Sequence, residues 1–187
     1  RGTMVYSSPT VSAIQQAVDD AAPGEFIRAA GYCFGVSSRA GVTQSLFISK
    51  LLTIQGGYTP TNWTASYPVT QPTTIDAQDG GRVIYITETA GALSNLVLRD
   101  GNVAGDGGGI YASENLTLSG ALLFGNEAGG NGGGVYLRHT SGGASRIVNS
   151  VFGRNSAAGN GMALYLLSPD GAGGTVEVIH TTIGFPA

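Results

Sequence analysis

The side chains that could do acid–base or metal chemistry are few in this chain of 187 residues, which carries 12 Asp and Glu side chains. The nearest approach to a carboxylate group is formed by Asp76, Asp79, Asp100 and Asp106. Asp76 and Asp79 precede a Gly-Gly pair, which favours an Asx turn over paired acid–base work. Asp106 aligns with asparagines of later units, and one carboxylate makes only a weak calcium candidate. The sequence therefore predicts no catalytic residue, no metal and no cofactor.

The two histidines and the single cysteine also give no sign of catalysis or metal binding. His139 stands in a polar loop and is expected at the surface. His180 occupies the position that Asn149 has in the preceding unit, which indicates a turn or surface role. The histidines lack metal-ligand spacing. Cys33, between Tyr32 and Phe34, is interpreted as a small buried apolar residue.

Aromatic residues are the strongest binding candidates. Tyr85, Tyr111, Tyr136 and Tyr165 recur at intervals of 26, 25 and 29 residues, and Phe47 fits the same place one unit earlier. Two interpretations stay open for this external row. The rings could stack on sugars or anchor a protein partner, or they could stack on one another and stabilise the strands.

A second aromatic candidate lies in an insertion at residues 58–72, which holds Tyr58 and the only tryptophan, Trp63. Long loops without regular structure are often functional. The alternative is that Trp63 folds back and covers the flank of the domain. The sequence leaves both interpretations open.

The elements that must position these side chains are short strands with period-two alternation. Gly-Gly-Gly triplets at 107–109 and 132–134 lead into two of the tyrosine segments, and Asp106, Asn131 and Asn160 align at the turn before them. Such units cannot bury an apolar face alone, so they must stack as a β-solenoid. The inward pairs expected in the tyrosine segments are Ile84/Ile86, Ile110/Ala112, Val135/Leu137 and Leu164/Leu166. A second column is expected from Leu96/Leu98, Leu116/Leu118, Ile147 and Val176/Val178, and a third from Leu123, Phe152 and Ile183.

The N-terminal segment has a different pattern. Val11, Ile14, Val18 and Ala21 lie on one helical face, and Ser12 with Gln15 predicts a capping box. A helix here would cover the first coil, whose open edge otherwise invites pairing with other chains. We therefore predict residues 1–24 as an N-terminal segment with a capping helix and 25–187 as coils of one domain.

Composition supports this fold class. The 31 glycines exclude a helical bundle, and 42% hydrophobic residues argue against disorder. Nine basic residues, scattered singly, give no footprint for nucleic acid. No apolar run is long enough to span a membrane.

The helix, followed by Gly24–Tyr32 and Leu52–Tyr58, resembles the start of right-handed parallel β-helix proteins of the pectin-lyase-like superfamily. The Gly-Gly-Gly-Ile/Val-Tyr units and Phe152-x-x-Asn155 resemble the repeats of polymorphic outer-membrane proteins and related bacterial surface proteins. Leu123 and Ile183 replace the phenylalanine in the other units. The resemblance implies an all-β, right-handed parallel β-helix with an extracellular or cell-surface location.

Three functions follow as expectations. The first is a non-catalytic structural or adhesive module that binds glycans or surface proteins. The second, from the resemblance, is a polysaccharide lyase or hydrolase, although the hydrolase signatures of the superfamily are missing. The third is a filament subunit that associates end to end, since one coil end carries no capping helix.

Overall fold

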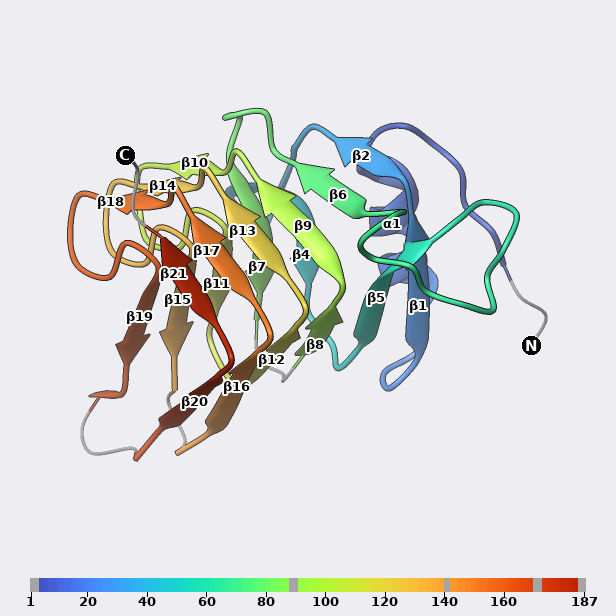
Figure 1. Ribbon diagram of the computed structural model, residues 1–187. Helices are drawn as coiled ribbons and strands as arrows, with labels where there is room; N and C mark the ends of the chain where they lie inside the picture. Colours follow the sequence, from blue (N-terminus) through green and yellow to red (C-terminus); the bar gives the residue numbers. More distant parts are fainter. Residues whose placement is uncertain (1–3, 88–90, 140–141, 170–172, 185–187) are drawn as a thin grey trace.

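The computed structural model describes residues 4–87, 91–139, 142–169 and 173–184. Its strands form a parallel β-solenoid of about five turns, with successive coils stacked along one axis (Figure 1). Strands of neighbouring coils pair in parallel, and the antiparallel β3–β4 hairpin lies within the first coil. The predicted all-β parallel β-helix with one helical cap is confirmed. The proposed division at residue 24 stays a prediction.

Three six-stranded sheets form the flanks of the solenoid. Sheet 1 contains β1 (Phe26–Ala30), β5 (Thr53–Tyr58), β8 (Gly91–Ser94), β12 (Leu116–Ser119), β16 (Ala144–Val148) and β20 (Thr175–Ile179). Sheet 2 contains β2 (Tyr32–Phe34), β6 (Thr73–Asp76), β9 (Leu96–Arg99), β13 (Leu122–Phe124), β17 (Val151–Gly153) and β21 (Thr182–Gly184). Sheet 3 contains β3 (Ser37–Arg39), β4 (Val42–Ile48), β7 (Arg82–Ile86), β11 (Ile110–Ala112), β15 (Val135–Arg138) and β19 (Leu164–Leu167). A small sheet joins β10 (Asn102–Val103), β14 (Glu127–Ala128) and β18 (Ser156–Ala157).

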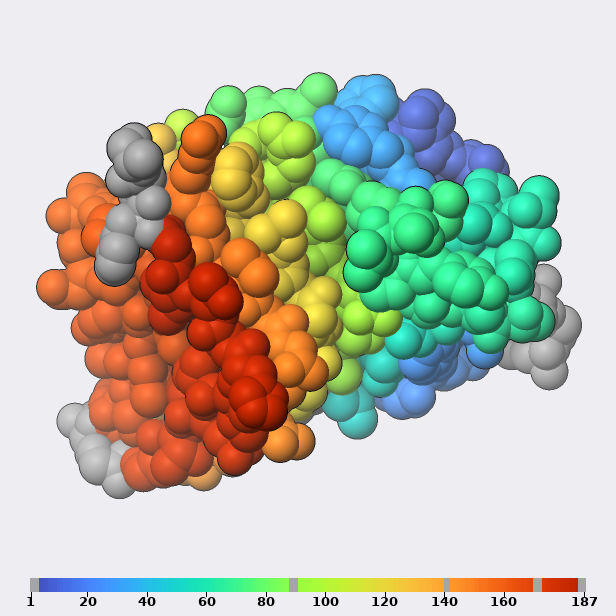
Figure 2. Space-filling model, in the orientation of Figure 1, coloured from blue at the N-terminus to red at the C-terminus, as the bar shows by residue number. Residues whose placement is uncertain are grey.

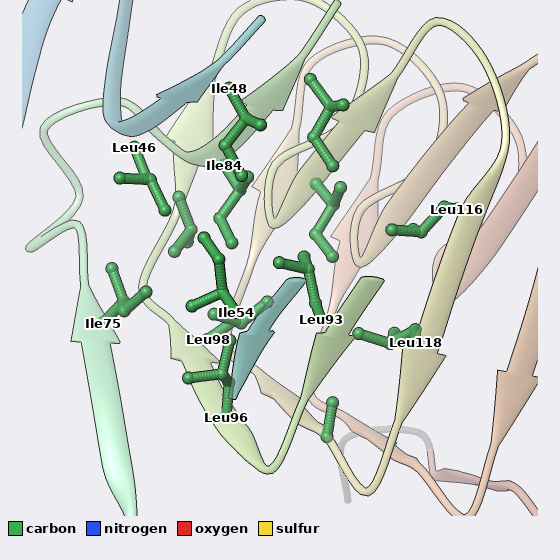
Figure 3. Close-up of a cluster of buried hydrophobic side chains, with 14 of the residues drawn as sticks. Leu46, Ile48, Ile54, Ile75, Ile84, Leu93, Leu96, Leu98, Leu116 and Leu118 are labelled. Atoms are coloured by element: carbon green, nitrogen blue, oxygen red, sulfur yellow. The ribbon is translucent and has the colours of Figure 1, made fainter. Parts of the chain in front are cut away.

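The core is the column of aliphatic side chains that the three sheets enclose (Figure 3). In sheet 3, Ile84, Ile110 and Val135 stand in register and are fully buried. Their column continues to Leu164 in the last coil, which is only half-buried. The predicted inward pairs of the tyrosine segments are therefore confirmed in their register. Each fully buried aliphatic side chain contributes roughly 1.5–3 kcal/mol.

One predicted column is wrong in part. Leu96 and Leu98 belong to β9 in sheet 2, where Leu98 pairs with Leu123 of the next coil. The strand that enters sheet 1 in their place is β8, and its Leu93 pairs with Leu118. The reason is local: β8 and β9 are separated only by Asn95, which takes a left-handed φ of 56° and turns the corner. The stronger alternation of β9 concealed that two strands lie there.

Close approach of the coils explains the glycine triplets. A Cβ added to Gly134 would lie 2.5 Å from the carbonyl oxygen of Ala163 and 2.8 Å from Cδ1 of Phe152. Gly132 has a φ of 68°, which L side chains rarely adopt. These positions therefore accept only glycine without rearrangement.

Two buried asparagines connect neighbouring coils beside the core. Nδ2 of Asn126 donates to the carbonyl oxygen of Leu98 at 3.1 Å and to Oδ1 of Asn155 at 2.9 Å. Oδ1 of Asn126 accepts from the backbone N–H of Gly101 at 3.0 Å. Asn155 repeats the pattern one coil later by donating to the carbonyl oxygen of Leu123. The asparagines of the repeat thus satisfy backbone groups where the chain turns.

Helix α1 (Ser12–Asp20) covers the first coil, with Ile14 and Val18 buried against the core. The predicted capping box is wrong, because Val11 is the N-cap and no side chain caps the helix. Gln15 instead bonds the backbone of Phe47, through Oε1 to N–H at 2.8 Å and Nε2 to C=O at 3.1 Å. That contact pairs the backbone of β4 at Phe47, which lies beyond Ser37, the first residue of the antiparallel strand β3.

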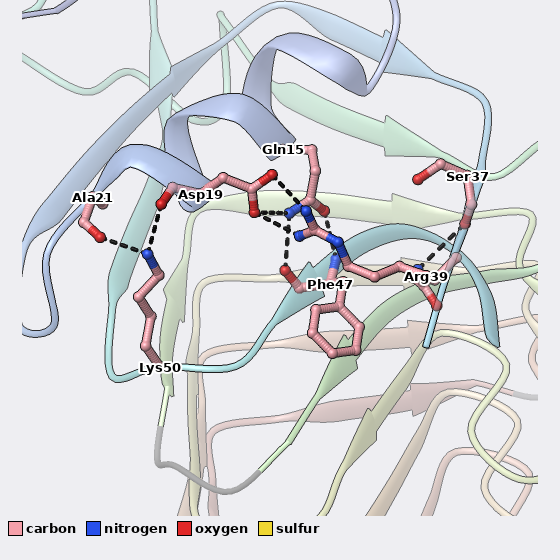
Figure 4. A network of polar contacts seen from close by, with 8 residues as sticks. Gln15, Asp19, Ala21, Ser37, Arg39, Phe47 and Lys50 are labelled. Atoms are coloured by element: carbon pink, nitrogen blue, oxygen red, sulfur yellow. Dashed lines mark hydrogen bonds and ion pairs between the residues drawn. The ribbon is translucent and has the colours of Figure 1, made fainter. Parts of the chain in front are cut away.

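The helix is fixed at its C-terminal end as well (Figure 4). Lys50 Nζ donates to the carbonyl oxygens of Asp19 and Ala21 at 2.8 and 2.6 Å, the terminal acceptors that a helix leaves free. Asp19 also accepts two hydrogen bonds from Arg39, at 2.5 and 2.8 Å, and Arg39 lowers the pKa of that carboxyl.

In the described part of the chain, no helix has the length and apolarity needed to cross a membrane.

Candidate functional site: an external tyrosine ladder and its groove

The tyrosine ladder consists of Phe47, Tyr85, Tyr111, Tyr136 and Tyr165 on the outer side of sheet 3. Each residue pairs directly with the next across neighbouring parallel strands. The period-two rule places them outward because their neighbours on both sides point into the core. The predicted ladder, including the position of Phe47, is therefore formed.

The rings stack on one another along the solenoid axis. Ring centroids lie 4.9 Å apart for Tyr85 and Tyr111, 5.0 Å for Tyr111 and Tyr136, and 5.5 Å for Tyr136 and Tyr165, with interplanar angles of 22°, 15° and 17°. At this spacing a sugar ring has no room between the tyrosines. The stacking interpretation thus describes the geometry, and burial within the stack raises the pKa of Tyr136. Whether the ladder binds a ligand stays a prediction.

What the ladder leaves available is its hydroxyl edge. Tyr85, Tyr111 and Tyr165 are half-buried, while Tyr136 is 5% exposed. Among the described residues, no hydrogen-bond partner is found for the hydroxyl of any of the four tyrosines. A row of phenol groups with unused donors and acceptors follows one flank of the solenoid.

Arg82 lies beside this row, and the sequence analysis missed it. Its guanidinium carbon lies 5.1 and 5.3 Å from the ring centroids of Tyr85 and Tyr111. Nε and Nη2 donate to the carbonyl oxygens of Gly107 and Asp106, at 2.7 and 2.6 Å. Arg82 is 5% exposed, and burial lowers its pKa. The signal was an arginine three residues before Tyr85, where Tyr111 and Tyr136 are preceded by glycines.

A shallow groove of about 440 Å³ opens over the N-terminal half of the ladder. Tyr85, Tyr111 and Arg82 line it from sheet 3. Thr43 of the hairpin and Asn102 of β10 add a hydroxyl and an amide. The groove therefore combines aromatic edges with neutral polar groups and one buried cation.

The turn beside the ladder is held by an Asx row. Oδ1 of Asp106 accepts from the backbone N–H and Nδ2 of Asn131, at 2.7 and 3.1 Å. Oδ1 of Asn131 accepts from the backbone N–H of Asn160 at 2.8 Å. The predicted alignment of these three residues is confirmed. The calcium candidate Asp106 thus has one carboxylate oxygen engaged in a structural contact, and within the described residues no three His, Cys, Asp or Glu side chains group to hold a metal.

Tyr58 and Trp63 lie apart from the ladder, at the N-terminal end of the solenoid. Their rings stack with centroids 6.2 Å apart, and the indole N–H of Trp63 donates to the carbonyl oxygen of Pro60 at 3.1 Å. Tyr58 is 6% exposed, whereas Tyr67 is 48% exposed in the same insertion. Figure 2 shows this insertion standing out beside the first coils. Trp63 therefore covers Tyr58, as the covering interpretation expects, and also borders an open cavity.

Two of the scattered carboxylates meet around Arg99 on the outer side of sheet 2. Nε of Arg99 donates to Oδ2 of Asp100 at 2.6 Å and lies 3.5 Å from Oδ2 of Asp76. Asp76 also accepts from the hydroxyl of Tyr32 and from the backbone N–H of Gln78. The hydrogen bond to Asp76 raises the pKa of Tyr32. This arrangement neutralises the carboxylates and forms the Asx turn that the sequence predicted at Asp76.

The structure corrects the position of His139, which was expected in solvent. His139 is fully buried, and its Nε2 lies 2.8 Å from Oγ of Ser145. Ser145 in turn accepts from the backbone N–H of Leu116 at 2.8 Å. Nε2 of His139 and the Ser145 hydroxyl thus pair with each other, whereas Nδ1 of His139 is buried with no hydrogen-bond partner among the described residues. Burial lowers the pKa of His139.

His180 and Cys33 lie as predicted. His180 has a φ of 46°, and Asn149, its counterpart one coil earlier, has a φ of 49°. Both are turn residues in the left-handed region. Cys33 is a free thiol, 8% exposed within the core, and burial raises its pKa.

Comparison of the chain with protein-family models, with curated proteins and with solved structures finds no match. The structure therefore shows the architecture, a parallel β-solenoid of about five turns, and no match places the chain in a family.

Proposed function

We propose that this chain is a non-catalytic, extracellular or cell-surface β-helix module with an adhesive role, and that it binds a glycan strand along the tyrosine ladder. The observation that carries the proposal is the row of tyrosine hydroxyls, spaced by the coil repeat, for which the described part of the chain offers no hydrogen-bond partner. A polymer with regularly repeated hydroxyl groups could bond to successive rungs. Many weak contacts on one rigid surface give high overall affinity.

The groove supports the same ligand class. Its Thr43 hydroxyl and Asn102 amide can exchange hydrogen bonds with sugar hydroxyls. The glycan would lie across the aromatic edges, because the ring faces are occupied by one another. Surface-protein binding is the alternative for the same edge, since tyrosine combines an apolar body with a polar tip.

The test is a glycan array probed with the wild-type chain and three variants. Tyr111→Phe keeps the stack and removes one hydroxyl, so binding should weaken roughly fivefold, the equivalent of one hydrogen bond of about 1 kcal/mol. Tyr111→Ala should weaken it further by opening the stack. Tyr67→Phe, which removes an exposed hydroxyl from the insertion, is the matched control and should bind like wild type. Binding that is absent in the wild type, or equal in all four proteins, returns the ladder to a purely structural role.

The enzyme alternative can be judged in parallel. Polysaccharide lyase or hydrolase activity rests on likeness of fold alone. Incubating the chain with a panel of acidic polysaccharides, with and without calcium, should give no turnover. Sustained product formation would replace the adhesive proposal.

The filament alternative has an obstacle at the N-terminal end. Helix α1 packs on β1 and β4 and covers the apolar end of the first coil, so a complete coil cannot stack there, although the edge of β1 itself pairs with no strand in the described residues. We therefore expect no end-to-end assembly in light scattering. Growth of scattering with concentration would contradict this expectation.

A further inference from the structure

The strand edges that face the N-terminal end of the solenoid differ in whether another segment covers them. The edge of β4 is covered by β3, which pairs with it in an antiparallel hairpin. The edge of β2 is covered by the N-terminal segment, where Phe34 exchanges backbone hydrogen bonds with Pro9 and Val11. Strand β1 is the terminal strand of sheet 1, and in the described residues no strand pairs with its outer side.

The free groups on this edge can be assigned. The carbonyl oxygen of Glu25 accepts from the N–H of Thr53, so Glu25 faces β5. In a parallel ladder alternate residues bond to the same neighbour. Phe26 and Arg28 therefore direct their backbone N–H and C=O groups away from β5. Unpaired edge groups of this kind are a template for an additional strand.

The edge opens into an apolar cavity of about 610 Å³. The cavity is lined by Ala13, Ile14 and Ala17 of α1 and by Phe26 and Trp63. Residues 4–9 of the N-terminal segment also line it. The volume is within the range of ligand sites, roughly 300–1,000 Å³. A strand placed along β1 would direct alternate side chains to the buried face, with Ile27 and Ala29, and to the exposed face, with Phe26 and Arg28.

Charge at the opening indicates which peptide fits. Asp20 and Glu25 are exposed and line the cavity. Asp20 accepts from the Tyr6 hydroxyl at 2.6 Å and Glu25 from the Ala22 N–H at 2.8 Å, but within the described residues neither carboxylate has an ion pair. Arg28 is the cation on this rim, and its guanidinium lies over the rings of Phe26 and Tyr58, 5.3 and 5.8 Å from their centroids. Because no cation neutralises these two carboxylates within the described residues, they favour basic side chains beside the apolar ones.

We propose that the β1 edge is a peptide-binding site that takes an extended segment with alternating apolar and basic residues by β-augmentation. Apolar side chains enter the cavity below α1, and the peptide backbone pairs with Phe26 and Arg28. An extended peptide suits the site better than a lipid, because hydrocarbon leaves the edge N–H and C=O groups unsatisfied. The site is separate from the tyrosine ladder and does not depend on glycan binding.

The probe is a labelled six-residue peptide that alternates lysine and valine, titrated with the whole chain by fluorescence anisotropy. A peptide with glutamate in place of lysine should bind at least tenfold more weakly. Peptides N-methylated on alternate residues should bind unequally, since only one set of N–H groups faces β1. Hydrogen exchange at Phe26 and Arg28 should slow when the unmodified peptide binds.

Two variants of Phe26 separate the backbone from the side chain. Phe26→Pro removes an edge N–H at the first residue of an edge strand, where proline is tolerated. It should bind the peptide about fivefold more weakly than Phe26→Ala, which keeps the N–H. If Phe26→Pro does not fold, the N-methylated peptides on the wild-type chain decide. Equal binding of both N-methylated forms and the parent peptide, or no binding of the parent, overturns the proposal.

Discussion

The buried asparagine ladder offers a sharp test of how the coils hold together. Asn126→Ala removes the side chain that accepts from the Gly101 N–H and donates to the Leu98 carbonyl oxygen. Asn126 is fully buried, so neither backbone group gains bulk solvent when the amide is lost. The variant leaves the Gly101 N–H unpaired inside the solenoid, while the Leu98 carbonyl oxygen keeps the ladder hydrogen bond that the register of β9 and β13 gives it.

The magnitude follows from the orphaned Gly101 N–H and the lost bond to the Leu98 carbonyl oxygen. A buried donor without a partner costs about 1–3 kcal/mol and a lost hydrogen bond about 1 kcal/mol, so the free energy of unfolding should fall by about 2–4 kcal/mol. That is a large share of the roughly 5–15 kcal/mol that stabilises an ordinary domain. Asn155→Ala should behave similarly, since Asn155 Oδ1 accepts from both the backbone N–H and Nδ2 of Asn126. The double variant should cost less than the sum, because the two side chains share a bond.

Urea unfolding followed by circular dichroism measures the effect. Asn102→Ala is the matched control, because Asn102 is exposed on β10 only one residue beyond the turn glycine Gly101. The control should change stability by no more than about 0.5 kcal/mol. If Asn126→Ala costs less than about 1 kcal/mol, similar to the control, then the asparagines do not hold the coils together and the reasoning is refuted.

Three further changes test other parts of the structure. The free energy of unfolding should be constant above about pH 6.5 and fall below it, because buried His139 stays neutral while the same imidazole takes up a proton in the unfolded chain. Urea midpoints that do not fall toward pH 5, or that fall equally in His139→Leu, contradict this prediction. Gly134→Ala should cost about 1–3 kcal/mol through overpacking, whereas Gly105→Ala, with open space at its Cβ, should be near neutral in thermal melts. Arg39→Ala should cost at most about 1 kcal/mol, since its ion pair with Asp19 is half-exposed, and added salt should shrink the difference.

The sequence could predict the features that repeat. The tyrosine ladder, the inward pairs of sheet 3 and the Asx row were all found because each recurs once per coil with period-two neighbours. The capping helix was found from its apolar face, through Ile14 and Val18. The capping box failed, because Ser12 and Gln15 have the right spacing but Gln15 bonds Phe47, which is distant in the sequence.

The contacts that could not be predicted from the sequence are those that occur in one coil and do not repeat in the others. His139 is buried and bonds Ser145, which belongs to the next strand. Arg82 gains its carbonyl partners from a turn 24 and 25 residues later. The unpaired edge of β1 depends on which neighbouring edges the hairpin and the N-terminal segment cover. None of these leaves a periodic signal, because each depends on how one particular loop folds over the coils.

The parallel stacking of the coils explains why the outer surface carries few charged side chains, and it limits what the surface can bind. Parallel register stacks equivalent residues about 4.8 Å apart, so a charge repeated in every coil would repel itself. Where charged residues are neighbours across strands, their signs are opposite: Asp76 pairs with Arg99, and Arg146 pairs with Glu177. The ladder of tyrosines avoids the conflict, since neutral rings attract when stacked. A surface built by this rule presents hydroxyls and amides in rows and, in the described residues, has no rows of like charge. It therefore favours a neutral, hydroxyl-bearing polymer over a polyelectrolyte as the ligand that we propose for the ladder.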